Sequence, residues 1–284
     1  MSHKISKNCA KSKEQEFAAS LRSIGLPREP QRVVSLVPSI TETLFAVGLG
    51  SRVVGVTDWC IHPADALRSV PRVGGTKNPR IRDILRLQPD LVIANHEENR
   101  KIDVERLSSS GVPVWVSYPR TVSEGIRLIE ELVYLGADGA CVRDITEPMR
   151  SLVERVQNSY SEENRVRVFC AIWKNPWITV GQDTFIHDIL VTCGGINVCD
   201  APLEDRYPHL PLEKLTEYAP EVILLPDEPY PFTDADVMEL SRLSIPASAN
   251  NRIYTMDGTL LSWYGPRITP GVRTVAALLH GEIE

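Results

Sequence analysis

The chain has 284 residues, of which 43% are hydrophobic and 24% charged, and its formal net charge is -6 at pH 7. A globular chain of this length and composition can hold two compact lobes, each with its own core. The acidic balance argues against nucleic acid as the main partner, because phosphate binding needs a basic face. No apolar run approaches the ~20 residues that span a bilayer, so we expect no membrane-spanning helix.

Residues 1–30 are predicted to form a mobile, charged lead-in. Met1–Lys13 carries the charges of a signal peptide, but the apolar stretch that a signal peptide or a lipidated cysteine requires does not follow. Pro27 and Pro30 separate this segment from the first strand. We therefore expect a cytoplasmic location for the chain as given, and an extracytoplasmic one if a signal has been removed.

Residues 31–119 are predicted to form a first α/β lobe. Short apolar runs at 32–37, 53–56 and 89–94 are each bounded by Pro, Gly or Asp, which predicts buried parallel strands. The loops that follow these strands leave the carboxyl edge of the sheet, where open α/β sheets bind ligands.

A helix should start directly after the first strand, where Pro38 turns the chain. Ser39 or Thr41 is predicted to cap this helix, and Gly48 to end it. Backbone N–H groups at a helix start attract polar ligand groups. The candidate contacts here are Pro38, Ser39 and Ile40, through the two N–H groups of Ser39 and Ile40 and the Ser39 hydroxyl.

Residues 120–136 are predicted to form a connecting helix, with a capping pattern at Thr121–Glu124. Residues 137–284 then form a second α/β lobe. Its first part continues the helical spacing, and Pro148 should lie near a first turn or a kink. The strands of this lobe are expected at residues 166–172, 178–181, 222–226 and 252–256.

The placement of the aromatic residues is the main functional signal. The chain has only 5 Trp, 8 Tyr and 5 Phe, yet several fall in loops predicted at carboxyl ends of strands. Such rings offer a large flat ligand a wide contact area at little entropic cost. The candidates for ligand contact are Trp59, Trp173, Tyr207 and Trp263. Packing inside a lobe is the preferred interpretation for Trp115 and Trp177.

Three segments carry a resemblance to a known family: Ser-Leu-Val-Pro-Ser-Ile-Thr-Glu (35–42), Gln-Pro-Asp-Leu-Val-Ile-Ala (88–94) and Cys-Gly-Gly-Ile-Asn (193–197). In this order they resemble the cobalamin and iron-chelate substrate-binding proteins of ABC importers, over about residues 32–279. The resemblance implies two Rossmann-like α/β lobes joined by a single long backbone helix, with a ligand cleft between the lobes. It also implies a non-catalytic, monomeric protein that binds a corrinoid or another metal chelate and has no intrinsic cofactor.

The resemblance also carries over residue by residue. Trp59 and Tyr207 match positions where cobalamin-binding members place aromatic contacts, and Trp173 lies beside such a position. Gly75-Thr76 and Asn95 stand where those members carry tryptophans, so a different ligand or a different corrinoid stays open. Asn95 is kept as a candidate contact.

Two basic side chains are further candidates. His96 follows a strand end, where a neutral ring nitrogen could coordinate the metal of a bound chelate, although a surface histidine is the simpler interpretation. Arg267 could meet an anionic ligand group if it turns inward, and would otherwise be a surface charge at a helix start.

Permease docking gives a sharper test of the importer role. In the importer proteins, one glutamate on each lobe meets arginines of the membrane partner, and such pairs fix register. Glu213 matches the second-lobe position, whereas Arg82 replaces the first-lobe acid and only the adjacent Asp83 could substitute. The alternatives are an exported importer protein for an iron-siderophore or haem, and an enzyme or scaffold that reuses the fold. The sequence has no nucleophile-elbow, P-loop, dinucleotide-binding or zinc-protease motif.

Overall fold

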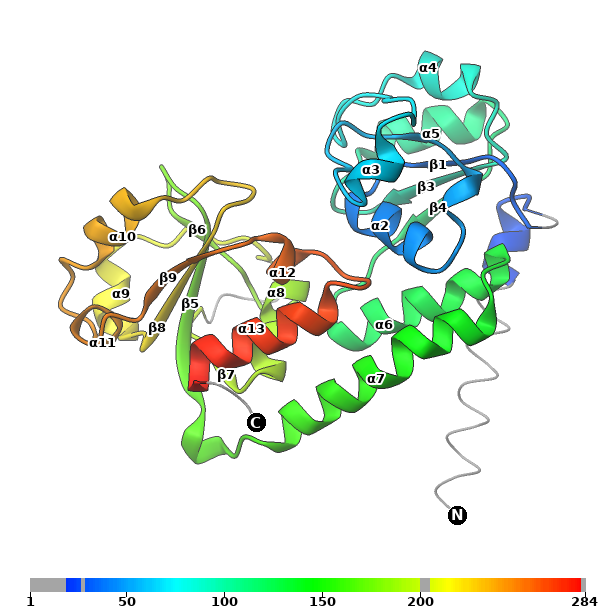
Figure 1. Ribbon diagram of the computed structural model, residues 1–284. Helices are drawn as coiled ribbons and strands as arrows, with labels where there is room; N and C mark the ends of the chain where they lie inside the picture. The colour runs from blue at the N-terminus through cyan, green and yellow to red at the C-terminus, as the bar shows by residue number, and fades with distance from the viewer. Residues whose placement is uncertain (1–18, 27–28, 200–204, 282–284) are drawn as a thin grey trace. The chain divides into compact units, whose positions relative to one another are not determined.

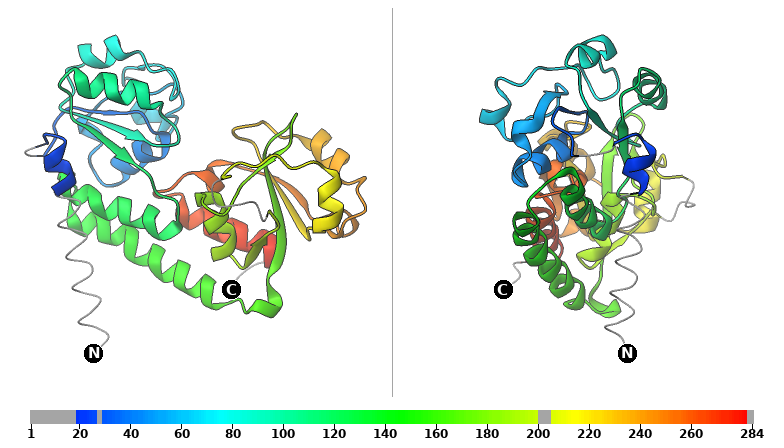
Figure 2. Two further views of the ribbon diagram at one scale, coloured as in Figure 1. Left: turned by 180° about the vertical axis from the view of Figure 1, so that it is seen from behind. Right: turned by 90° about the vertical axis from the view of Figure 1, so that its right-hand side faces the viewer.

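The computed structural model describes residues 19–26, 29–199 and 205–281. The chain divides into two compact units, each with its own sheet (Figure 1). Unit 1 comprises the residues up to Tyr118 together with Arg127–Thr146, and unit 2 comprises Pro119–Ile126 and the residues from Glu147 onward. Figure 2 shows the same elements from two further sides.

Unit 1 is built on a parallel sheet in the order β2-β1-β3-β4. Its strands are β1 (Val33–Ser35), β2 (Val53–Val56), β3 (Leu91–Asn95) and β4 (Val114–Ser117). Its helices are α2 (Pro38–Ala46), η1 (Gly50–Arg52), α3 (Ala64–Leu67), α4 (Ile81–Arg86) and α5 (Lys101–Ser109). Helices α4 and α5 cover one face of the sheet and α2 the other (Figure 1). Because all four strands are parallel, their carboxyl ends meet at one edge.

The helical connection lies where the sequence predicts it, in two parts separated at Gly136. It consists of α6 (Val122–Glu131), η2 (Leu132–Leu135) and α7 (Gly139–Asn158). Gly136 takes the left-handed conformation at φ 93° and ends η2, as its freedom at positive φ allows. The chain then resumes as α7, which spans 20 residues and holds Pro148 in its middle rather than in its first turn. The division into compact units falls within α6 and within α7.

Unit 2 is also built on a parallel sheet, to which one antiparallel strand is added. Its strands are β5 (Val166–Trp173), β6 (Ile178–Thr179), β7 (Gly195–Asn197), β8 (Val222–Pro226) and β9 (Ile253–Met256). Its helices are η3 (Glu162–Asn164), α8 (Phe185–Thr192), α9 (Glu213–Tyr218), α10 (Asp234–Leu240), α11 (Pro246–Ala249), α12 (Thr259–Ser262) and α13 (Ile268–His280). Helices α9 to α11 lie on one side of this sheet and α8, α12 and α13 on the other (Figures 1 and 2).

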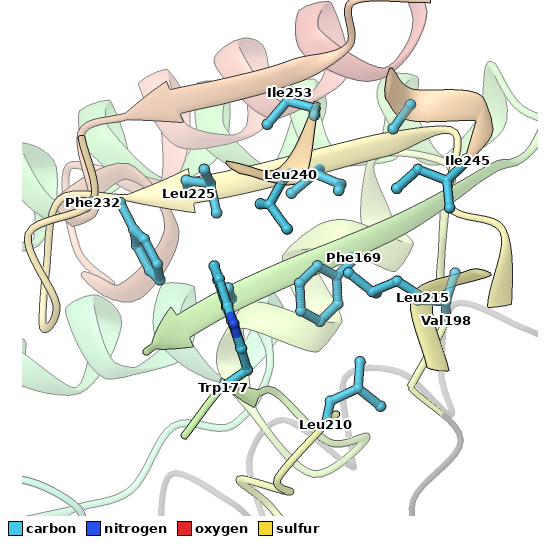
Figure 3. Close-up of a cluster of buried hydrophobic side chains, with 13 residues drawn as sticks. Phe169, Trp177, Val198, Leu210, Leu215, Leu225, Phe232, Leu240, Ile245 and Ile253 are labelled. Carbon is cyan, nitrogen blue, oxygen red and sulfur yellow. The ribbon is translucent and has the colours of Figure 1, made fainter. Parts of the chain in front are cut away.

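The core on the α9–α11 side contains a stack of aromatic rings (Figure 3). Trp177 lies nearly parallel to Phe232, with ring centroids 5.7 Å apart and an interplanar angle of 13°. Phe169 of β5 is fully buried in the same cluster. Trp177 is buried with them, which confirms the predicted packing role of this ring.

The predicted cap of α2 is corrected. Neither Ser39 nor Thr41 caps α2: the cap position is Val37, without a side-chain bond, and Pro38 occupies the first turn. The Thr41 hydroxyl instead donates to the Val37 carbonyl within the helix, at 3.0 Å. Gly48 follows the helix end at φ 82°, as predicted.

The predicted lead-in is described only in part, since residues 1–18 and 27–28 lie outside the described residues. Residues 19–23 are helical, and both Leu21 and Leu26 are buried, whereas a mobile, charged lead-in was expected over residues 1–30. In the described part of the chain, no helix combines the length and the apolar content that crossing a membrane requires.

Candidate functional site

Three adjacent strands of unit 1 release the predicted contact residues at one edge of the sheet. Ser39 follows β1, Trp59 follows β2 and His96 follows β3. Since the sheet order is β2-β1-β3, these three loops are neighbours. The sequence therefore placed these residues correctly with respect to the sheet of unit 1.

Trp59 is exposed on a loop whose backbone is firmly held. Its side chain is 65% exposed. Arg72 donates from Nη1 to the carbonyls of Thr57 at 2.8 Å and Cys60 at 2.6 Å, and the Asp58 amide donates to the Gly74 carbonyl at 2.9 Å. The indole is thus presented to solvent from a fixed backbone, which lowers the entropic cost of stacking against a ligand.

A side chain at Gly75 would press against Asn78 and reach the edge of Trp59. A Cβ at this position would lie 2.3 Å from Asn78 Oδ1 and 3.6 Å from Trp59 Nε1. A contact of 2.3 Å is well inside the van der Waals distance, so Asn78 would have to move. The glycine therefore keeps the indole edge of Trp59 uncovered by this neighbouring loop.

The start of α2 contains a buried hydroxyl group without a partner. Ser39 is 1% exposed, and its Oγ has no hydrogen-bond partner among the described residues. The N–H groups of a first helical turn also lack partners within the helix. A buried polar group without a partner is costly, so a ligand group or water that reached this hydroxyl would be stabilised. Pro38 and Ile40 are buried beside it.

Asn95 holds the loop after β3 in shape. Its Nδ2 donates to the Ser117 carbonyl at 3.1 Å, and its Oδ1 accepts from the amides of Glu97 at 2.8 Å and Glu98 at 3.2 Å. Its side chain is only 2% exposed. Asn95 was predicted to contact a ligand. In the structure its side-chain amide is instead bonded inside unit 1.

His96, the next residue, is exposed. Its ring packs on Tyr118, with centroids 4.5 Å apart and an interplanar angle of 36°. Within the described ranges, no group of three or more His, Cys, Asp and Glu side chains gathers as a metal ion would require. His96 could therefore supply a single ligand to a metal that a bound molecule already carries.

In unit 2, Trp173 ends β5 with 41% of its side chain exposed. Its ring meets Tyr230 edge-on, with centroids 5.5 Å apart at 70°. Tyr230 packs in turn against Phe232 at 4.7 Å and so joins the exposed ring to the buried core. Sequence reasoning missed Tyr230, although it follows the carboxyl end of β8 and the criterion used for the other rings would have found it.

Lys174 fixes the end of β5 against α10. Its Nζ lies 2.6 Å from both Asp236 Oδ1 and Glu239 Oε2. The hydrogen bonds that Lys174 donates to Asp236 and Glu239 raise its pKa. Burial alone would raise the pKa of Asp236, but the bonds from Lys174 and Thr233 bring it below its usual value. The ion pairs therefore position the neighbouring Trp173.

Tyr207 lies on a segment that pairs with the strand β6 and the residues after it. The Thr179 amide donates to the Pro208 carbonyl at 3.0 Å, and the Gly181 amide to the Arg206 carbonyl at 2.8 Å. The Tyr207 ring is 41% exposed, and the Arg206 guanidinium carbon lies 5.5 Å from its centroid. Like Trp59 and Trp173, this ring is presented on a backbone that hydrogen bonds hold.

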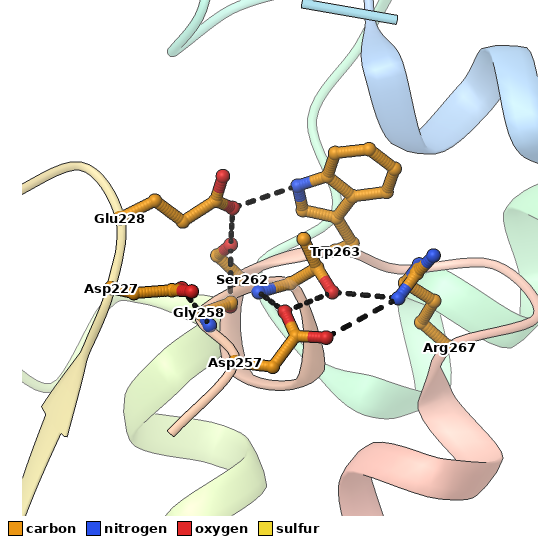
Figure 4. A network of polar contacts seen from close by, with 8 residues as sticks. Asp227, Glu228, Asp257, Gly258, Ser262, Trp263 and Arg267 are labelled. Atoms are coloured by element: carbon orange, nitrogen blue, oxygen red, sulfur yellow. Dashed lines mark hydrogen bonds and ion pairs between the residues drawn. The ribbon is translucent and has the colours of Figure 1, made fainter. Parts of the chain in front are cut away.

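Trp263 and Arg267 are held inside a polar network (Figure 4). Trp263 is 8% exposed, and its Nε1 donates to Glu228 Oε1 at 2.9 Å. The Arg267 guanidinium carbon lies 5.1 Å from the Trp263 ring, and its Nη1 donates to Thr259 Oγ1 at 2.7 Å and lies 3.7 Å from Asp257 Oδ2. Trp263 was predicted to contact a ligand, but its ring is buried and its N–H is already bonded within unit 2.

Glu228 was not identified from the sequence. It follows β8 by two residues, and it also accepts a hydrogen bond from Ser262 Oγ at 3.1 Å. Burial raises the pKa of its carboxyl group, against the opposing effect of the two donors. The sequence around a loop carboxylate does not show whether the group is buried, because its burial depends on residues far along the chain.

Comparison with known proteins gives consistent results. The family model described as "Periplasmic binding protein" matches residues 33–260. A vitamin B12-binding protein of Vibrio cholerae is 26% identical over 253 residues, which cover 89% of this chain and 90% of the relative. An uncharacterized ABC transporter substrate-binding lipoprotein, YvrC of Bacillus subtilis, is 28% identical over 272 residues, 92% of this chain and 84% of the relative.

A solved structure agrees with these sequence matches. The crystal structure of the periplasmic vitamin B12 binding protein BtuF of Vibrio cholerae superimposes with a TM-score of 0.76 at 26% identity, over 89% of this chain and 98% of that one. The predicted α/β fold of two Rossmann-like lobes is confirmed, as is the predicted resemblance to importer substrate-binding proteins. With most of its length matched by the family model, the chain belongs to the periplasmic binding protein family.

Proposed function

We propose that this chain binds a corrinoid or another metal chelate and releases it chemically unchanged. The observation that carries the proposal is the exposure of Trp59, Trp173 and Tyr207 on fixed loops beside the sheets. Rings of this size, left uncovered in a folded chain, offer the flat contact area that a macrocycle needs. The similarity to vitamin B12-binding proteins supports a corrinoid as the first choice.

The metal would arrive with the ligand, and no intrinsic cofactor is proposed. His96 is exposed beside Tyr118, so it is the candidate side chain for an open coordination position of such a metal. Haem and ferric siderophores are the competing ligand classes. An enzyme that reuses the fold is the competing class of function, and it would show turnover of the bound molecule.

We expect purified protein to bind cyanocobalamin and aquocobalamin in a calorimetric and absorbance titration. Aromatic stacking does not depend on the upper ligand of cobalt, so both forms should bind. If His96 coordinates cobalt, only aquocobalamin should change its spectrum, because cyanide holds the site more strongly than water. The His96→Ala variant should then lose the spectral change and keep the stacking affinity.

A titration that shows no binding of either cobalamin would exclude the corrinoid. Haemin and a ferric hydroxamate would then be titrated in the same way, and binding of neither would exclude the chelate-binding function as a whole. Conversion of a cobalamin into a different compound on mixing would favour the enzyme.

Docking to an ABC permease is the proposed partner interaction, and it rests on the likeness to importer proteins. Glu213 is exposed at the start of α9, as docking requires. Arg82 is exposed on α4, and Asp83 is paired with Arg80 at 2.7 Å and Arg86 at 3.1 Å. The bond from Arg80 lowers the pKa of Asp83. The negative charge of Asp83 is therefore already paired with the neighbouring arginines Arg80 and Arg86.

The Arg82→Glu variant should bind a permease with an arginine pocket several-fold more tightly than the unchanged chain, because it removes a repulsive charge. The measurement is the dissociation constant for permease in nanodiscs at low salt. Glu213→Arg should act in the opposite direction. Weaker binding of Arg82→Glu would show instead that the permease presents an acidic surface to α4.

The location of the chain stays a prediction. The relatives reported above are described as periplasmic or as a lipoprotein. The expected cytoplasmic location rests on the composition of residues 1–13 alone. Fractionation of cells that express the native gene with a C-terminal tag would decide, since a periplasmic product appears in the osmotic-shock fraction.

A further inference from the structure

The carboxylate of Glu228 uses only one of its two oxygens for bonds within unit 2 (Figure 4). Trp263 Nε1 and Ser262 Oγ both donate to Oε1, at 2.9 Å and 3.1 Å. Across the described residues, Oε2 has no hydrogen-bond or ion-pair partner, and the close-up shows it directed away from both donors. An ionised carboxylate can accept about four hydrogen bonds, so this oxygen retains its full accepting capacity.

Glu228 lies at the same edge of the unit 2 sheet as the exposed ring of Trp173. Glu228 leaves the carboxyl end of β8, and Tyr230, two residues later, packs against the exposed Trp173. The two donors fix the carboxylate plane, so its free oxygen has a defined direction before any ligand arrives. Preorganisation of this kind is what distinguishes a recognition group from a solvated surface charge.

The charges around Glu228 disfavour an anionic ligand group. Asp227 accepts from the Gly258 amide at 2.8 Å, and Asp257 lies close enough, with Asp227, to raise the pKa of Glu228 further. The nearby cation, Arg267, already lies 3.7 Å from Asp257. A carboxylate brought to this position would meet like charges, whereas an amide N–H would meet an acceptor.

We propose that Glu228 Oε2 accepts a hydrogen bond from an amide N–H at the rim of the ligand, and so selects an amide-bearing macrocycle over a dicarboxylate one. This inference rests on the proposed chelate-binding function and deepens it. Corrinoids carry primary amides around the ring, whereas haem carries two carboxylates. A hydrogen bond to an ionised acceptor is roughly twice as strong as a neutral one, so this bond should contribute clearly to the preference for the amide-bearing macrocycle.

The Glu228→Gln variant tests this with a change of few atoms. Its amide oxygen can still accept from Trp263 and Ser262, so the internal bonds of unit 2 are kept. The free position becomes an N–H donor in place of an acceptor. Cyanocobalamin should then bind about 10-fold or more weakly, because two donors face each other, while haemin should bind no more weakly than to the unchanged chain.

Affinities of cyanocobalamin and haemin would be measured by calorimetry for the unchanged chain, Glu228→Gln and the control Glu217→Gln, whose carboxylate is exposed on α9. The expected result is a loss for cyanocobalamin in Glu228→Gln alone, with an unchanged melting temperature. Equal losses for both ligands, or a lowered melting temperature, would show that Glu228 only clamps α12 and would overturn the inference.

The inference and the proposed function fail in different ways. If the unchanged chain binds cyanocobalamin and Glu228→Gln binds it equally well, Glu228 has no role in recognition, and the binding function stands. If the unchanged chain prefers haemin, the selection for amides is wrong. If it binds no chelate at all, the proposed function falls and the inference falls with it.

Discussion

Replacing Trp59 by alanine should weaken ligand binding by about 10- to 100-fold, the range expected for a large aromatic contact at the centre of a binding surface. The side chain is 65% exposed, so its removal leaves no cavity in unit 1. The backbone bonds from Arg72 to the carbonyls of Thr57 and Cys60 do not involve the indole and should persist. Affinity should therefore fall while the melting temperature stays the same.

The matched control is Tyr134→Ala, which removes another exposed ring of unit 1 at η2, away from the carboxyl ends of the strands. This variant should bind the ligand as the unchanged chain does. Trp59→Phe should recover most of the affinity, because a smaller ring still stacks. If Trp59→Ala bound the ligand with full affinity, the carboxyl edge of unit 1 would not be part of the binding surface.

The strands could be predicted from the sequence because a buried parallel strand leaves a strong local signal. β2, β5 and β8 are apolar runs bounded by turn residues, and the structure places them within one or two residues of the prediction. β7 was not among the predicted strands, because two successive glycines, Gly194 and Gly195, favour a turn, whereas Gly195 begins a strand that pairs with Val166. Its three residues are too few to show a pattern of their own.

The exposure of Trp263 could not be predicted in this way, because the burial of a ring depends on residues distant in the chain. Trp59 and Trp263 carry the same sequence signal, an aromatic ring shortly after a strand. Trp59 remains exposed beside Gly75, which has no side chain, whereas Trp263 is buried where Glu228 accepts its N–H. The sequence thus predicted the edge of each sheet and most of the rings left uncovered there, but not the burial of Trp263.

The distinction between exposed and buried rings is sharpest at Trp173 and Trp177, which lie in the same β5–β6 hairpin. Trp177→Ala should lower the free energy of unfolding of unit 2 by about 3–5 kcal/mol, because it removes a ring from a closed core and leaves a cavity. Its stack on Phe232 and its contact with Lys174, whose Nζ lies 5.4 Å from the ring, would both be lost. Urea unfolding followed by far-UV circular dichroism measures this loss.

Trp173→Ala should have the opposite profile, with a stability change of about 1 kcal/mol or less and a clear loss of ligand affinity. Its ring is 41% exposed and loses mainly the edge contact with Tyr230. Because the two variants share a hairpin and a residue type, they differ only in whether the ring faces the core. Equal destabilisation by both would mean that Trp173 belongs to the core. The carboxyl edge of unit 2 would then present Tyr207 and the Glu228 oxygen to a ligand, without an indole.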